Sequence, residues 1–150
     1  MPQDLFSILE TQQNRGYTAP EEKEMIREVQ GARQVRGEGF RRWFTDQYFD
    51  LIVWYEGADA QSQVAGYQLC YDKTSRERAL TWRKGLGFTH EKVDDGEGVR
   101  ALGAKMTPIL VPDGLFDAAG ITRRLLEHSA EMDPEVAGFV LKTLEGYGRE

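Results

Sequence analysis

A period-two pattern between Phe49 and Glu56 constrains this fold more than any other feature of the chain. One set of alternating residues is wholly apolar: Phe49, Leu51, Val53 and Tyr55. The set between them is mixed: Asp50, Ile52, Trp54 and Glu56. Because successive side chains of a strand point to opposite faces of a sheet, the first set is predicted to face a core. Ile52 and Trp54 make the second face too apolar for full exposure to water.

Neighbouring stretches repeat this design. Residues 64–71 and 78–82 alternate in the same way, and residues 88–93 and 105–111 are further strand candidates. Short polar breaks separate the first three strands, with lengths that suit hairpins and not crossover helices. Pro108 cannot donate to a sheet ladder, so the last strand is predicted to lie at an edge or to pair irregularly there. The expected sheet is an antiparallel β-meander of about five to six strands over residues 38–111.

Helices are predicted on both sides of this sheet. Residues 4–15 carry apolar side chains at helical spacing, and a capping-box spacing from Thr18 to Glu21 predicts a second helix to about Gln30. Residues 115–128 are predicted as one helix or as two pieces interrupted near Gly120. The run from Asp133 to Glu135 marks the start of a last helix that ends near residue 146. The chain is therefore predicted to be a single α+β domain, helical over 4–30, a sheet over 38–111 and helical again over 114–146.

Composition narrows the function classes. The 150 residues carry a formal net charge of −6, which argues against nucleic acid or an anionic membrane as the main partner, because both require a concentrated positive field. The first residues contain no secretory signal pattern, and no segment approaches the apolar length of a membrane span. We therefore expect a soluble cytoplasmic protein. Cys70, the single cysteine, is expected to be a small buried side chain.

The mixed sheet face is the first candidate site. Its predicted ligand-binding residues are Trp54, Gln68, Thr81 and Arg83, beside Ile52 and Cys70. An apolar floor with a few polar groups is typical of small-molecule sites. Two alternatives stay open, because a terminal helix or a second subunit in a homodimer could cover the same face.

A group of titratable side chains after residue 88 is the second candidate. Its members are His90, Glu91, Asp94, Asp95 and Glu97. Carboxylates beside an imidazole could hold a hard divalent cation or form a pair for proton transfer. The spacing matches no metal signature, so the alternative is an acidic, solvated loop beside a strand histidine. The face on which His90 lies depends on the strand register.

No catalytic motif has its required context. Residues 96–101 match the G-x-G-x-x-A spelling of a dinucleotide loop, but Gly103 and Pro108 leave no room for the helix that must follow it. No serine lies in a G-x-S-x-G elbow. The sequence favours a non-catalytic domain that binds a small molecule or a protein partner through its aromatic sheet face, without a cofactor. The alternative is a small metal-assisted or acid/base-assisted hydrolase centred on His90 and the Asp94–Asp95 loop.

Overall fold

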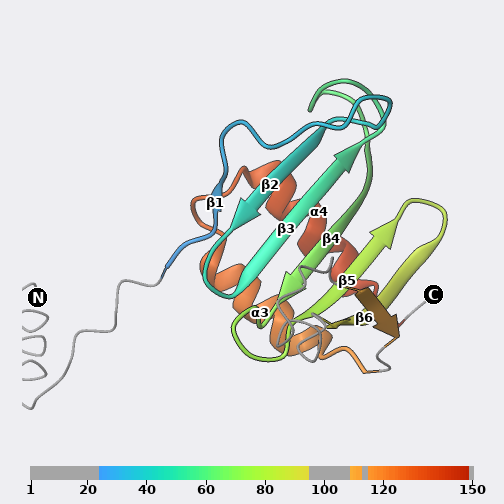
Figure 1. The fold of residues 1–150 in the computed structure, drawn as a ribbon. Coiled ribbons are helices and arrows are strands. Elements are labelled where there is room, and N and C mark those ends of the chain that lie inside the picture. The colour runs from blue at the N-terminus through green and yellow to red at the C-terminus, as the bar shows by residue number, and fades with distance from the viewer. Residues whose placement is uncertain (1–23, 95–108, 113–114, 149–150) are drawn as a thin grey trace, which may run out of the picture.

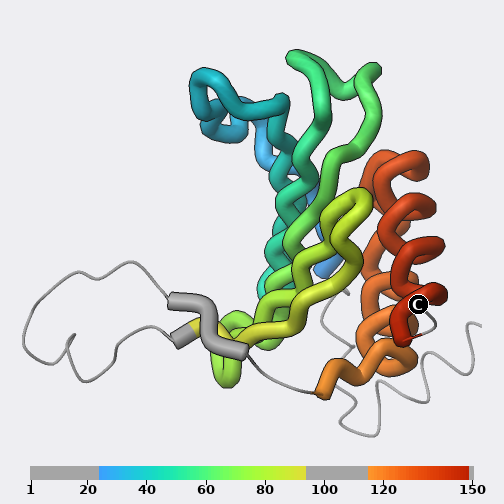
Figure 2. The backbone as a smooth tube through the Cα atoms, turned by 90° about the vertical axis from the view of Figure 1, so that its right-hand side faces the viewer, coloured from blue at the N-terminus to red at the C-terminus, as the bar shows by residue number. Residues whose placement is uncertain are grey.

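The computed structural model describes residues 24–94, 109–112 and 115–148. These residues form one antiparallel sheet followed by two helices, α3 and α4, which lie together against one face of the sheet (Figure 1). In the view turned by 90°, both helices stand on the same side of the strands (Figure 2). The α+β class and the antiparallel meander predicted from the sequence are confirmed.

Seven strands lie side by side in chain order, and each pairs with the next in antiparallel fashion. They are β1 (Arg27–Glu28), β2 (Arg41–Thr45), β3 (Phe49–Tyr55), β4 (Val64–Tyr71), β5 (Arg78–Arg83), β6 (Gly87–Asp94) and β7 (Ile109–Pro112). Strands β2 to β7 form a six-stranded meander, within the predicted five to six strands, and the two-residue β1 extends it. As predicted, the last strand lies at an edge of the sheet, although Pro108 itself lies outside the described residues.

The pairing register assigns the side chains to two faces. One row that crosses β2 to β6 toward the helices contains Phe44, Leu51, Leu69, Leu80 and His90. A row on the opposite face contains Trp43, Ile52, Gln68, Thr81 and Thr89. The face without α3 and α4 is called the open face below. The alternation predicted for residues 49–55 therefore places Leu51 and its companions in the core.

Helices α3 (Ala118–His128) and α4 (Pro134–Glu145) cover the core face through their apolar sides. Their buried residues are Ile121 and Leu125 of α3 and Val136, Ala137, Val140 and Leu144 of α4. Tyr67 stacks on Trp82 at 5.8 Å between ring centroids, and both rings meet Phe139 of α4 edge-on. Among the described residues, no helix has the length and apolar character needed to cross a bilayer.

Side-chain caps set where both helices begin. Asp117 accepts a hydrogen bond from the backbone N–H of Gly120 at 3.1 Å, and Asp133 accepts one from that of Glu135 at 2.9 Å. These bonds satisfy N–H groups that have no partner within the helix. The predicted start of the last helix is confirmed. The region predicted as one helix or two pieces over 115–128 is one helix, which begins at Ala118 and runs through Gly120 without interruption, because the Asp117 cap uses the Gly120 N–H to begin the helix.

The predicted helix from Thr18 to Gln30 is wrong over residues 24–30, the part that the structure describes. Arg27–Glu28 forms β1 and pairs with the end of β2. Ile26 is fully buried, and its backbone N–H donates to the carbonyl of His128 at 2.9 Å. Burial of Ile26 against the C-terminal helices therefore prevails over the capping pattern, since tertiary packing overrides weak local propensity. The predicted helix over residues 4–15 lies outside the described residues.

Gln34 protects the exposed edge of β2. Its side-chain amide donates to the carbonyl of Arg41 at 2.8 Å and accepts from the backbone N–H of the same residue at 2.9 Å. The amide thus occupies the positions that a neighbouring strand would take. Open strand edges promote association between chains, so this bond pair blocks pairing at that point.

Arg42 joins the sheet to α4. Its guanidinium donates two bonds to Glu28 at 2.7 and 2.9 Å, one to the Tyr55 hydroxyl at 3.3 Å and one to Asp133 at 3.1 Å. The bonds to Glu28 raise the pKa of Arg42 above its ordinary value. Because these partners come from β1, β3 and the cap of α4, this cation fixes the position of the helix on the sheet.

We expect Leu51→Ala to lower the free energy of unfolding by about 2–5 kcal/mol, because it removes a fully buried side chain and leaves a cavity. Leu126→Ala is the matched control, since Leu126 is 62% exposed on α3. Urea unfolding followed by circular dichroism measures both. Equal losses for the two variants would contradict the assignment of the core face.

The Asp133 carboxylate gives a pH-dependent contribution to stability. The backbone bond from Glu135, and then Arg42, hold its pKa below the ordinary 3.8. A depressed pKa stabilises the folded state above the unfolded-state value, and this contribution is lost as the pH falls through the folded-state value. Asp133→Asn keeps a capping oxygen, so we expect it to cost at most about 1 kcal/mol at pH 7 and progressively less below pH 4. A cost that stays constant in urea unfolding from pH 7 to pH 2.5 would contradict this assignment; Asp59→Asn is the control.

Candidate ligand site on the open sheet face

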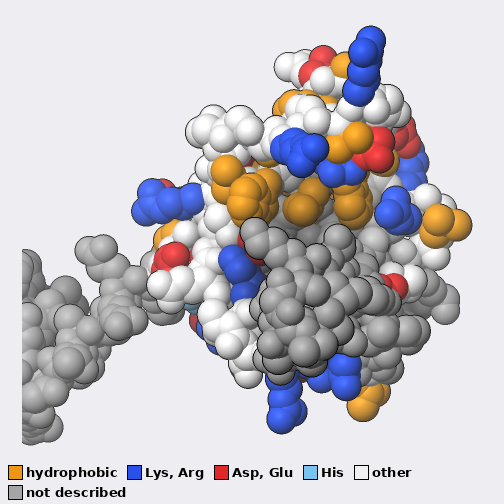
Figure 3. All heavy atoms as spheres, in the orientation of Figure 1, with side chains coloured by type: hydrophobic (Ala, Val, Ile, Leu, Met, Phe, Trp, Pro, Cys, Tyr) orange, Lys and Arg blue, Asp and Glu red, His pale blue; other side chains and the backbone are white. Residues whose placement is uncertain are grey.

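The open face carries apolar side chains that α3 and α4 do not cover, among them Trp43 and Ile52. Figure 3 views the molecule from this side and shows a row of hydrophobic side chains on the part of the face that is drawn in colour, with charged side chains above and beside them. Trp43 is 37% exposed, and it lies directly opposite Ile52 in the pairing of β2 with β3. Two strands therefore contribute neighbouring apolar surface that faces solvent.

A hollow of about 350 Å³ opens on this face. It is lined by Trp43, Asp50, Ile52, Gln68, Cys70, Glu77 and Val93, and we call it the Asp50 hollow. Its volume lies at the lower end of the range for small-molecule sites, about 300–1,000 Å³. Apolar side chains from β2, β3 and β6 form its walls, and polar side chains from β3 and β4 lie between them. This is the arrangement predicted for the mixed sheet face.

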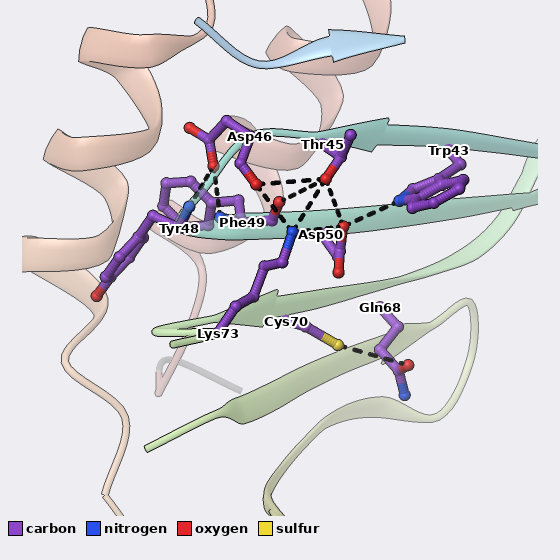
Figure 4. A network of polar contacts seen from close by, with 9 residues as sticks. All are labelled: Trp43, Thr45, Asp46, Tyr48, Phe49, Asp50, Gln68, Cys70 and Lys73. Atoms are coloured by element: carbon purple, nitrogen blue, oxygen red, sulfur yellow. Dashed lines mark hydrogen bonds and ion pairs between the residues drawn. The ribbon is translucent and has the colours of Figure 1, made fainter. Parts of the chain in front are cut away.

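Asp50 is held in place by three donors that converge on one of its carboxylate oxygens (Figure 4). Its Oδ1 accepts from Trp43 Nε1 at 3.0 Å, from Thr45 Oγ1 at 2.6 Å and from Lys73 Nζ at 3.2 Å. Its Oδ2 accepts no hydrogen bond from the described part of the chain. In Figure 4 this second oxygen points away from the three donors, toward the strand that carries Cys70 and Gln68. Asp50 therefore presents a fixed acceptor toward the hollow.

Lys73 stands behind Asp50 with its hydrogen-bonding capacity filled. Its ammonium donates to Asp50 Oδ1, to Thr45 Oγ1 at 3.1 Å and to the Asp46 carbonyl at 2.8 Å. An ammonium has three N–H donors, so none is left for a ligand. Lys73 thus acts as a structural cation that positions Asp50.

Cys70 and Gln68 form the β4 side of the hollow. Burial raises the pKa of the Cys70 thiol to about 12, and the charges of Glu77 and Asp50 add to this effect against Lys73. The thiol therefore stays protonated at neutral pH. The Gln68 amide nitrogen donates to Thr81 Oγ1 at 3.2 Å, which ties this side chain to β5.

Trp54 and Arg83 lie one row further along the open face. The guanidinium carbon of Arg83 stands 5.0 Å from the centroid of the Trp54 ring, a cation–π distance. Gly66 lies between these residues in the sheet, and a Cβ there would come within 2.5 Å of the Trp82 carbonyl oxygen. Glycine is therefore required for the close approach of β4 to β5 at this point. Neither residue of this pair lines the Asp50 hollow.

The structure separates His90 from Glu91. His90 faces the core, where its Nε2 is hydrogen bonded to the Tyr71 hydroxyl at 2.6 Å and its ring stacks on that of Tyr71. Glu91 lies on the opposite face, paired with Ala79. Asp94 is the last residue of β6, and Asp95 lies outside the described residues, as does Glu97. No group of three or more possible metal ligands lies together in the described ranges. A proton-transfer pair of His90 with Glu91 therefore has no geometric support.

A larger hollow, of about 580 Å³, lies on the helix side between the β3–β4 loop and the start of α4. Arg42, Tyr55 and Asp133 contribute to its lining. These polar groups are already bonded to one another, as described above, so their charges are matched within the protein. This hollow is therefore a weaker candidate for a ligand site than the Asp50 hollow, although its volume is larger.

All four ligand-binding residues predicted from the sequence lie on the open face, but their roles differ. Gln68 lines the hollow, and Thr81 accepts a hydrogen bond from the Gln68 amide. Trp54 and Arg83 contact each other and are not part of the lining. The residues that sequence reasoning missed are Trp43, Asp50, Lys73, Glu77 and Val93. The short turn at residues 46–48 fixes the register that brings Trp43 to Ile52, so alternation alone could have found Trp43 and Asp50.

We expect Cys70 to resist alkylation by iodoacetamide at pH 8, at a rate at least about 100-fold below that of an exposed thiol, because only the thiolate reacts. The same protein in 6 M guanidinium chloride is the control, and its thiol should react at the ordinary rate. Mass spectrometry over time measures both reactions. Equal rates in the folded and unfolded protein would contradict the buried, protonated thiol.

Comparison with known proteins identifies no relative, since no family model, curated protein or solved structure matches this chain.

Proposed function

We propose that this protein is a non-catalytic binding domain that holds a small, partly apolar ligand in the Asp50 hollow. The observation that carries this proposal is the combination of apolar walls with a fixed, outward-facing carboxylate oxygen. Small-molecule sites combine apolar area with a few polar groups whose positions are set in advance. Asp50 meets the second condition because three donors on one oxygen fix the direction of the other.

The side chains around the hollow support binding more than catalysis. The Cys70 thiol is protonated at neutral pH, and the Lys73 ammonium is fully engaged. Neither group is therefore available as a nucleophile or base. His90, the residue on which the hydrolase hypothesis was centred, faces the core on the other side of the sheet.

The exposed apolar surface favours a small ligand over a large protein interface. A stable interface buries about 800 Å² on each partner, with large apolar side chains at its centre. Among the described residues, Trp43 is the one large apolar side chain of the open-face strands that is more than a third exposed. One such side chain beside a hollow matches a compact ligand better.

A fragment screen followed by NMR tests the proposal. The chain has three tryptophans, hence three indole N–H signals, which Trp→Phe variants assign. We expect bound fragments to shift the Trp43 signal, because this N–H bonds to Asp50 at the hollow. The Trp82 signal should stay unchanged, since that ring packs against Tyr67 and Phe139 on the core face.

Ile52→Ala should weaken the binding of such fragments at least about fivefold by removing wall contacts. Leu126→Ala, which removes an exposed apolar side chain from α3, should leave the affinity unchanged. If fragments shift the Trp82 signal or bind equally to Ile52→Ala, the proposed site is wrong. If Trp43 responds to a second copy of the chain instead, visible as a concentration-dependent shift without ligand, the open face is a subunit interface.

A further inference from the structure

Around the Asp50 hollow, the hydrogen-bond donors have acceptors within the protein, but one acceptor oxygen has no donor among the described residues. The Trp43 indole N–H and all three N–H groups of Lys73 are engaged by acceptors within the protein. Asp50 Oδ2, in contrast, accepts no hydrogen bond from the described residues and points away from the three donors, toward the strand that carries the lining residues Cys70 and Gln68 (Figure 4). A ligand that meets this oxygen must therefore bring a hydrogen-bond donor of its own.

The charges around the hollow have the same sign. Two of its lining side chains, Asp50 and Glu77, are carboxylates, and no described lining side chain is basic. Lys73 forms an ion pair with Asp50, with 3.2 Å between its Nζ and Asp50 Oδ1. Both carboxylates act on the Cys70 thiol in the same direction, against Lys73. The net charge of −6 adds a weaker attraction for cations over the whole surface.

The apolar walls determine what kind of cation fits. Ile52, Val93 and the Trp43 ring offer no ligand atoms to a hydrated metal ion, but they offer contact area to a hydrocarbon group. An indole face also attracts an ammonium through its quadrupole. The volume of about 350 Å³ limits the ligand to a compact molecule.

We propose that the Asp50 hollow binds an organic cation, an ammonium group carried on a compact apolar body. This inference rests on the proposed binding function. The ammonium donates to Asp50 Oδ2 and lies near the Glu77 carboxylate, and the apolar body lies between Trp43, Ile52 and Val93. A bond between charged partners in a partly buried site is worth roughly ten- to a hundredfold in affinity.

Three probes of similar shape test whether the hollow prefers a positively charged ligand. They are benzylamine, benzyl alcohol and benzoate, each titrated into the full chain at pH 7 and constant ionic strength. The Trp43 indole signal and isothermal calorimetry report binding. We expect benzylamine to bind at least about tenfold more tightly than benzyl alcohol, and benzoate to bind least. Constant salt removes differences in screening between the titrations.

Asp50→Asn is the decisive variant, because it keeps an oxygen for Trp43 and Thr45 and removes the charge. The variant should lower the affinity for benzylamine at least about tenfold and change the affinity for benzyl alcohol less than twofold. Glu77→Gln, which leaves the Asp50 network intact, should weaken benzylamine to a smaller extent. Glu145→Gln on α4 is the control for net charge and should have no effect, since α4 covers the other face.

The outcomes separate this inference from the proposed function. If benzylamine and benzyl alcohol bind equally at Trp43 and Asp50→Asn changes neither, the cation inference is wrong and the binding site stands. If benzoate binds most tightly, the cation inference is also wrong. If no probe shifts the Trp43 signal at millimolar concentration, both the inference and the site are wrong.

Discussion

The alternation of side chains across an antiparallel sheet is the constraint on which the rest of this structure depends. Once Phe44, Leu51 and Leu80 are buried beneath α3 and α4, the residues between them must lie on the other face. The apolar character of Trp43 and Ile52 cannot be absorbed by the core without a shift that would expose every core residue of their strands. The open face therefore retains apolar surface as a consequence of the fold.

The Asp50 network adds a carboxylate of fixed orientation to that apolar surface. Three donors converge on Oδ1, including a lysine whose other bonds hold it to Thr45 and to the Asp46 carbonyl. Such a network fixes the carboxylate in advance, which would lower the entropic cost of binding the proposed ligand. Because Lys73 comes from the β4–β5 loop, the orientation of the Asp50 carboxylate depends on the conformation of that loop.

Much of the sheet was predictable because its signal is local. The bounds of β3 and β4 follow from alternation, and the start of α4 follows from the cap at Asp133. The segment around Ile26 was mispredicted, because its burial against the helix that ends at His128 depends on residues about a hundred positions away in the sequence. Local capping patterns carry no information about such contacts.

The site was predictable to a smaller extent for the same reason. Gln68 was found because strand alternation places it beside Ile52 on the mixed face. Lys73 and Glu77 come from a loop, where no periodicity indicates the direction of a side chain. His90 and Glu91 looked like a cluster in the sequence, but adjacent residues of a strand point to opposite faces, and the register decided which of them faces the core.

A crystal structure of the full chain with benzylamine would test the central claim most directly. We expect density for the ligand in the Asp50 hollow, with its nitrogen within about 3.2 Å of Asp50 Oδ2 and its ring against Trp43 and Ile52. Density for the ligand at any other place, or a hollow closed by another part of the chain, would contradict it.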